Sequence, residues 1–189
     1  MAGAIIQITV LLAGLVAADA GAPSKDRAKA PTRAEVESAL AKGGGPGELQ
    51  HWAATADGIL TVVAADRAAS EAARGRALAA LAYARTPRVH AFLENFIIEK
   101  TPSSAPVDWV LLRRAATALG WQGGARVVEV VAPLLDHSDA EVRLDAAAAL
   151  GLARAREAEA PLRARLAVET DAAVRRQIEA ALRAVTATR

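Results

Sequence analysis

Cysteine is absent from all 189 residues of the chain. This absence excludes disulfide bonds, thiolate metal sites, a catalytic cysteine and a lipidated N-terminal cysteine. Aromatic residues are also scarce, at 3%, whereas apolar residues make up 53% of the sequence. A core must therefore be built largely from Ala, Leu and Val, and Ala has the highest helix propensity of all residues. The composition predicts an all-α fold, in which β-strands should play little part.

The sequence also lacks the short motifs of common catalytic sites. His51, His90 and His137 are isolated, and neither HExxH, a His-Glu dipeptide nor GxSxG occurs. The glycine cluster at residues 43–47 lacks the Lys and Ser/Thr of a phosphate-binding loop. We therefore expect no catalytic residue, no metal site and no cofactor site, and we interpret the chain as non-catalytic.

A repeated segment organises the C-terminal half. The run DAEVRLDAAAALG at 139–151 returns 32 residues later as DAAVRRQIEAALR at 171–183. In both copies an Asp precedes a Val-Arg pair, and an alanine-rich run closes on Leu150 or Leu182. A spacing in the low thirties with helical composition indicates stacked helix pairs.

Earlier copies of the unit are marked by Leu119 and Leu81, and apolar residues follow each anchor leucine 12 and 16 positions later. Each unit is therefore predicted to be a first helix that ends near the anchor, a turn and a second helix. The predicted first helices are residues 70–83, 107–119, 140–153 and 172–185. The predicted second helices are residues 87–99, 125–136 and 157–168. Pro133 should kink or shorten the second of these.

These features resemble the HEAT-repeat family. The best match is the unit with Asp139, the Val142-Arg143 pair and the closing residues 149–151, whereas the unit around Leu81 lacks the Asp and the Val-Arg pair. The resemblance covers roughly residues 70–186. It implies a right-handed α-solenoid of about four stacked antiparallel helix pairs, and it identifies architecture far better than activity.

Two arginines fall on the inward stripe of their helices and need partners. Arg143 and Arg175 each lie seven residues before an anchor leucine, which places them close to it on the helical wheel. Asp139 and Asp171 lie on nearly the same face at the helix starts. We expect a structural Asp-Arg ladder between successive repeats, as the resemblance also implies.

The N-terminal residues predict the location of the protein. Residues 4–18 are uncharged and apolar, and Ala18-Asp19-Ala20 supplies small residues for cleavage after Ala20. We therefore expect a signal peptide at 1–20 and a periplasmic or secreted protein, with a membrane anchor formed by residues 4–18 as the alternative. A flexible linker at 21–31, an irregular helical cap at 32–69 and the repeat array at 70–189 should follow. Thr32 and Glu35 predict a capping box at the start of the cap.

Three tryptophans are the largest side chains. Trp109 is expected in the core, because it shares a wheel sector with Leu112. Trp52 and Trp121 lie near helix ends, where a Trp can seal a repeat junction or anchor a partner, and their wheel positions favour the first role.

The resemblance implies that the second helices line a concave face that binds a protein partner. The outward positions on these helices are Arg88, Glu94, Asn95, Arg126, Glu129, Arg156, Glu157 and Arg163. Both charge signs are interspersed, which disfavours nucleic acid despite the formal net charge of +2. We interpret the chain as an exported protein-binding scaffold. A small-ligand or bilin-lyase-type protein and a nucleic-acid-binding protein remain the alternatives.

Overall fold

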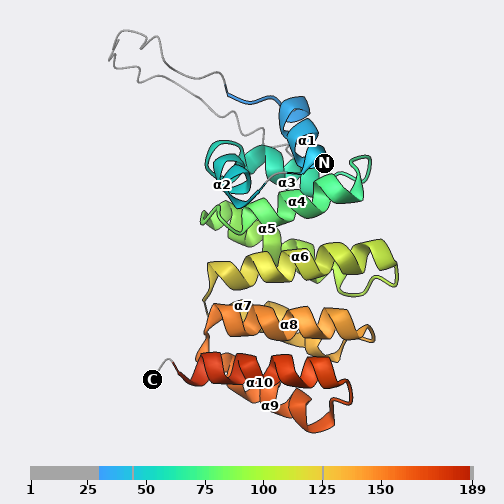
Figure 1. Cartoon of the computed structure of the whole chain (residues 1–189), viewed down its shortest axis with the longest axis vertical. Coiled ribbons are helices and arrows are strands. Elements are labelled where there is room, and N and C mark those ends of the chain that lie inside the picture. Colours follow the sequence, from blue (N-terminus) through green and yellow to red (C-terminus); the bar gives the residue numbers. More distant parts are fainter. Residues whose placement is uncertain (1–29, 44, 125, 188–189) are drawn as a thin grey trace, which may run out of the picture.

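The computed structural model describes residues 30–43, 45–124 and 126–187, and this part of the chain is helical without strands (Figure 1). The predicted signal peptide, the alternative anchor at 4–18 and nearly all of the predicted linker lie outside the described residues. Among the helices that are described, none combines the length and the apolar character needed to cross a membrane.

Four first helices stack one above another along the long axis of the molecule (Figure 1). They are α4 (Glu71–Leu81), α6 (Pro106–Gln122), α8 (Ala140–Ala153) and α10 (Ala172–Thr186). Ser70, Asp139 and Asp171 cap three of them, because each side chain accepts a hydrogen bond from a backbone N–H of the first turn. The four predicted first helices are confirmed.

The second helices are α5 (Pro87–Lys100), α7 (Arg126–Val131) with η1 (Ala132–Asp136), and η2 (Arg156–Ala158) with α9 (Glu159–Val168). Pro87 lies in the first turn of α5, where its missing N–H removes no hydrogen bond. Around Pro133 the α-helix ends at Val131 and continues as a 3-10 helix, as expected from the proline. The described array is thus an α-solenoid of three antiparallel helix pairs followed by α10.

The first helices approach one another closely because small residues lie between them. The anchor leucines Leu81, Leu119 and Leu150 are fully buried. A Cβ atom on Gly120 would lie 2.5 Å from the carbonyl oxygen of Ala149 on α8. A Cβ atom on Gly151 would lie 3.0 Å from the Cα atom of Ala181 on α10. The helices α6, α8 and α10 therefore meet backbone to backbone.

Three short helices precede the array and pack against α4. They are α1 (Arg33–Lys42), α2 (Pro46–Thr55) and α3 (Asp57–Ala65). The predicted capping box is confirmed at α1, where Thr32 and Glu35 bond reciprocally to each other's backbone N–H groups. Val36 and Leu60 are fully buried and extend the core of the array into this region.

The expected Asp-Arg ladder is wrong. Arg143 binds Glu169 instead, with Nε 2.8 Å from Oε2 and Nη2 3.0 Å from Oε1. Arg175 donates to the backbone carbonyls of Leu166 and Glu169. Asp139 and Asp171 accept hydrogen bonds from the N–H groups of their own helices, so their short side chains are already engaged in capping.

Glu169 joins two repeats through one buried carboxylate. Besides Arg143, it accepts hydrogen bonds from Arg165 at 2.9 Å and from the backbone N–H groups of Thr170 and Asp171. The hydrogen bond from Arg143 is the main cause that lowers the pKa of Glu169 from 4.5 to about 2, although burial opposes this shift. The carboxylate therefore stays ionised while it connects α8, α9 and α10.

Candidate functional site

The positions expected to contact a partner on the second helices are mostly exposed. Arg88, Asn95, Glu129, Arg156, Glu157 and Arg163 all face solvent. Arg163 is held by Glu159 on its own helix, with Nη2 2.9 Å from Oε1. Whether these residues contact a partner stays a prediction.

Glu94 does not belong to this exposed set, and its expected outward position is wrong. The residue is only 7% exposed. Its helix, α5, packs against three neighbours, α3, α6 and α7, so that more of its circumference is buried than the helical wheel alone indicates. Its Oε1 atom lies 3.0 Å from Nε of Arg126 and 3.3 Å from Nε2 of His90. Arg126 thus pairs with Glu94, although its side chain remains 71% exposed.

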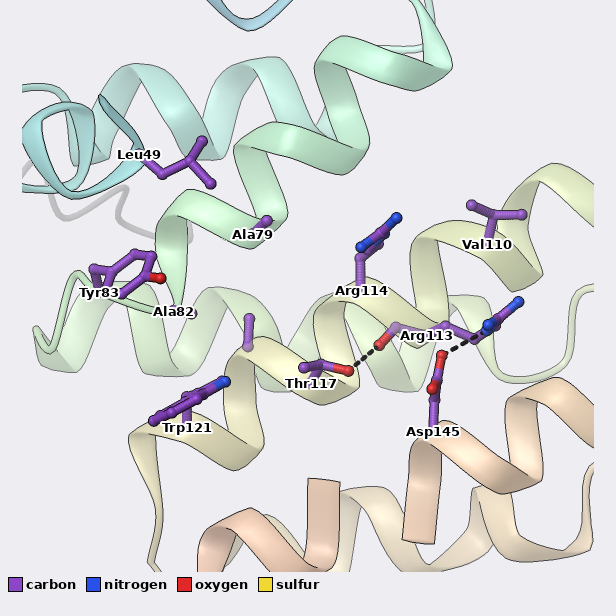
Figure 2. A pocket seen from close by; sticks show the side chains of 11 residues that line it. Leu49, Ala79, Ala82, Tyr83, Val110, Arg113, Arg114, Thr117, Trp121 and Asp145 are labelled. Atoms are coloured by element: carbon purple, nitrogen blue, oxygen red, sulfur yellow. Dashed lines mark hydrogen bonds and ion pairs between the residues drawn. The ribbon is translucent and has the colours of Figure 1, made fainter. Parts of the chain in front are cut away.

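A pocket of about 450 Å³ lies in the layer of first helices, between α4 and α6 (Figure 2). Its walls are Leu49, Ala79, Ala82, Tyr83, Val110, Arg113, Arg114, Thr117, Ala118, Trp121 and Asp145. Figure 2 shows the rings of Tyr83 and Trp121 at one end of the pocket and the two arginines with Val110 at the other. The pocket therefore combines an aromatic end with a cationic end.

The cationic end contains one arginine that is paired and one that is not. Arg113 Nε lies 2.6 Å from Oδ2 of Asp145 (Figure 2). Its Nη2 lies 3.0 Å from Oε2 of Glu141. Arg114 is exposed and makes no hydrogen bond or ion pair with any described residue. Its guanidinium group retains all of its donors for a ligand.

Two further pockets adjoin the first on the same layer. One of about 400 Å³ shares Leu49, Val110 and Arg114 with it and adds Glu71 and Arg76. The other, of about 540 Å³, shares Trp121 and adds Arg85, Leu152 and Arg154, among others. We name the surface formed by these three pockets the first-helix groove.

A row of apolar side chains follows the groove from repeat to repeat. Tyr83, Trp121 and Leu152 are 45%, 56% and 38% exposed, and each lies two residues after an anchor leucine. Exposed aromatic residues of this kind are enriched at binding surfaces. The sequence analysis missed this row, although the repeated offset from Leu81, Leu119 and Leu150 could have revealed it.

The tryptophans occupy three different environments. Trp121 does not seal a repeat junction as expected, because more than half of its surface is exposed in the groove. Trp109 packs against the core, as predicted, and donates from Nε1 to the carbonyl of Ser103 at 2.7 Å. Trp52 is half-buried beside α4.

Across the described ranges, no group of three or more His, Asp or Glu side chains is arranged to hold a metal ion. The groove arginines and aromatic rings are groups that bind and orient a ligand, since guanidinium groups remain protonated at any physiological pH. The chemistry on this surface is therefore that of recognition.

Comparison with known proteins identifies the array. A family model described as HEAT repeats matches residues 104–183, which run from the start of α6 into α10. No curated protein matches the chain. HEAT repeats are commonly protein-interaction scaffolds and are generally non-catalytic. Residues 104–183 are thus similar to HEAT repeats, which supports a HEAT-repeat family for this part of the chain.

Proposed function

We propose that this protein is an exported, non-catalytic scaffold that binds a segment of a partner protein in the first-helix groove. The observation that carries this proposal is the exposed apolar row of Tyr83, Trp121 and Leu152 beside pockets of a size that admits side chains. Buried aromatic anchors supply a large share of the energy of protein interfaces.

The groove is better suited to this role than the second-helix face. Arg126 and Arg163 on the second helices already pair with Glu94 and Glu159 of the same chain. A partner's carboxylate would therefore add little to binding at these arginines, because each already has a counter-charge. In the groove, by contrast, Trp121 exposes an apolar surface whose burial would favour binding.

The rigidity of the first-helix layer also supports the proposal. The groove lies on helices whose backbones are in contact at Gly120 and Gly151. A surface built on closely packed helices is already in its binding conformation, so association costs little ordering entropy. The array would then act by holding anchor sites at fixed positions.

Site-directed photo-crosslinking in cells tests which face binds. A photoreactive phenylalanine analogue would be placed at Tyr83 in the groove and, as a matched control, at Asn95 on the second-helix face. The expected result is a discrete crosslinked product from Tyr83 that disappears in the Trp121→Ala background. Products from Asn95 with none from Tyr83 would assign binding to the second-helix face instead.

Export is tested separately by the mass and N-terminal sequence of the protein recovered from cell fractions. The apolar run at 4–18 and the small residues before Gly21 support a mature start at Gly21. A full-length chain in the cytoplasm would contradict export and leave the binding proposal untouched.

A further inference from the structure

We infer that the partner segment held in the first-helix groove is acidic, with carboxylate side chains placed beside apolar anchors. This inference rests on the proposed function and specifies its partner. It follows from the charge of the groove, the arginines that have no partner within the described chain, and the apolar surface next to them.

The charge of the groove is strongly one-sided. Five arginines lie among its described lining residues, namely Arg76, Arg85, Arg113, Arg114 and Arg154. Only two carboxylates, Glu71 and Asp145, line the same pockets, and no lysine does. The whole sequence, with 23 basic and 21 acidic residues, is nearly balanced. The positive charge is therefore concentrated on this surface.

Three of these arginines already serve the fold. Arg113 pairs with Asp145 and Glu141. Arg76 donates to the carbonyl of Leu40 at 2.6 Å, and Arg85 donates to that of Trp121 at 3.2 Å. Of the five arginines that line the groove, two have no such contact with a described residue.

Arg114 and Arg154 are those two residues. Both are exposed, and neither side chain makes a hydrogen bond or ion pair with a described residue. Arg154 has φ of 49° at the end of α8, a left-handed position at which helices usually have glycine or asparagine. A guanidinium group binds a carboxylate through two parallel N–H···O bonds, which a neutral side chain cannot form.

The two free arginines line neighbouring pockets that share Trp121. Arg114 lines the pocket that contains Tyr83 and Trp121, and Arg154 lines the adjoining pocket that contains Trp121 and Leu152. A peptide could therefore place an apolar side chain against Trp121 and a carboxylate against each of the two arginines. This arrangement defines an acidic segment with a central apolar anchor.

A nucleic acid fits the groove less well. Glu71, Asp145 and Glu141 lie at or beside its walls and would repel a continuous phosphate backbone. A short peptide can avoid these carboxylates, because its charges are spaced and separated by neutral residues. The observations favour the peptide, and the test includes an oligonucleotide.

The test uses four fluorescein-labelled probes and the full-length protein. Three are peptides of about 15 residues, long enough to cross two neighbouring first helices. All three carry Leu at the same positions. The remaining positions are Glu in the first peptide, Gln in the second and Lys in the third. The fourth probe is an oligothymidylate. Binding is measured by fluorescence anisotropy at low and physiological salt.

The Glu peptide is expected to bind at least about tenfold more tightly than the Gln peptide, because charge-assisted hydrogen bonds to arginine are strong. The Arg114→Gln/Arg154→Gln variant should remove this preference. The matched control, Arg88→Gln/Arg156→Gln, removes two exposed arginines outside the groove and should leave the preference unchanged. Circular dichroism of each variant confirms that it is folded.

Other outcomes overturn the inference in distinguishable ways. Equal affinity for the Glu and Gln peptides, with both lost in Trp121→Ala, would overturn the acidic preference and leave the docking groove intact. Preferential binding of the Lys peptide, or tighter binding of the oligothymidylate, would overturn the acidic partner. If no probe binds, the acidic inference fails, and crosslinking from Tyr83 decides independently whether the groove docks a partner.

Discussion

At the scale of single residues, Glu169 connects the last two repeats. Its carboxylate is buried and binds Arg143, Arg165 and two backbone N–H groups. The Glu169→Gln substitution keeps the shape of the side chain and leaves the Arg143 guanidinium without its counter-charge. We expect the free energy of unfolding to fall by about 3 kcal/mol, because one partner of a buried pair is removed. Urea denaturation at neutral pH measures this loss.

The control is Glu159→Gln, which removes the partly exposed partner of the exposed Arg163 on the same helix, α9. Surface pairs one turn apart contribute about 0.5 kcal/mol or less. Similar losses for both substitutions would contradict the structural role assigned to Glu169.

The same residue predicts a pH dependence. The folded-state pKa of Glu169 is lowered from 4.5 to about 2, chiefly by the hydrogen bond from Arg143. A depressed carboxyl pKa stabilises the fold fully above the unfolded value, and this stabilisation is lost as pH falls toward the folded value. The stability difference between the wild type and Glu169→Gln should therefore be constant above about pH 5.5 and shrink steadily below pH 4.5. A difference that does not change down to pH 3 would refute this assignment.

Some contacts of single residues can be predicted from the sequence, and others cannot. The capping roles of Thr32 and Ser70 follow from local chemistry, and the sequence reveals the Thr32 capping box directly. The partner of Arg143 cannot be predicted from local sequence. Glu169 lies outside the repeated motif, 26 residues from Arg143, and only the folded path of the chain brings it within reach.

At the scale of elements, the contact between first helices depends on two glycines. Gly120→Ala would place a Cβ atom 2.5 Å from the carbonyl oxygen of Ala149, and backbone cannot move aside as a flexible side chain can. We expect a loss of about 1–3 kcal/mol in stability, as for overpacked cores. Gly151→Ala meets Ala181 at 3.0 Å and should cost less. Thermal unfolding ranks the variants.

Gly75 provides the matched control, because it also lies within a first helix but a Cβ atom added there would meet no neighbouring atom within 4 Å. Gly75→Ala should stabilise the protein by up to about 1 kcal/mol through helix propensity alone. A destabilisation by Gly75→Ala as large as that by Gly120→Ala would show that close approach is not the cause.

The helices themselves could be predicted well, because periodicity and turn chemistry are local. Pro133 indicated the end of α7, and the anchor leucines indicated the ends of the first helices. The burial of Glu94 could not be predicted, since it depends on how many neighbouring helices cover α5.

At the scale of the whole molecule, binding and stability should separate in the groove. Trp121 and Tyr83 are about half exposed, so their loss removes little buried surface from the fold. We expect Trp121→Ala to change the free energy of unfolding by about 0.5 kcal/mol or less. The same variant should abolish crosslinking from Tyr83, since aromatic anchors contribute strongly to interfaces.

A comparison with a buried residue on the same helix makes this prediction specific. Leu119 lies two residues before Trp121 on the same helix and is fully buried. Leu119→Ala should cost about 2–5 kcal/mol in stability. A Trp121→Ala variant that unfolds as readily as Leu119→Ala would mean that Trp121 serves the core rather than a partner.

The choice of face could not be made from the sequence. Wheel positions separate inward from outward residues on one helix, but they do not show which outward residues pair with neighbours or form pockets. Arg163 and Arg114 are both outward arginines, yet only Arg163 is neutralised by a nearby carboxylate, that of Glu159. That difference depends on the folded surroundings of each side chain.

The two layers of the array also differ in mechanical terms. The first helices α6, α8 and α10 are in close backbone contact, whereas two of the three second helices contain 3-10 segments and the second helices pack less extensively on one another. A bending force should therefore change the spacing of the second helices and leave that of the first helices nearly constant. A partner bound along the first helices would therefore keep its register with them while the array flexes.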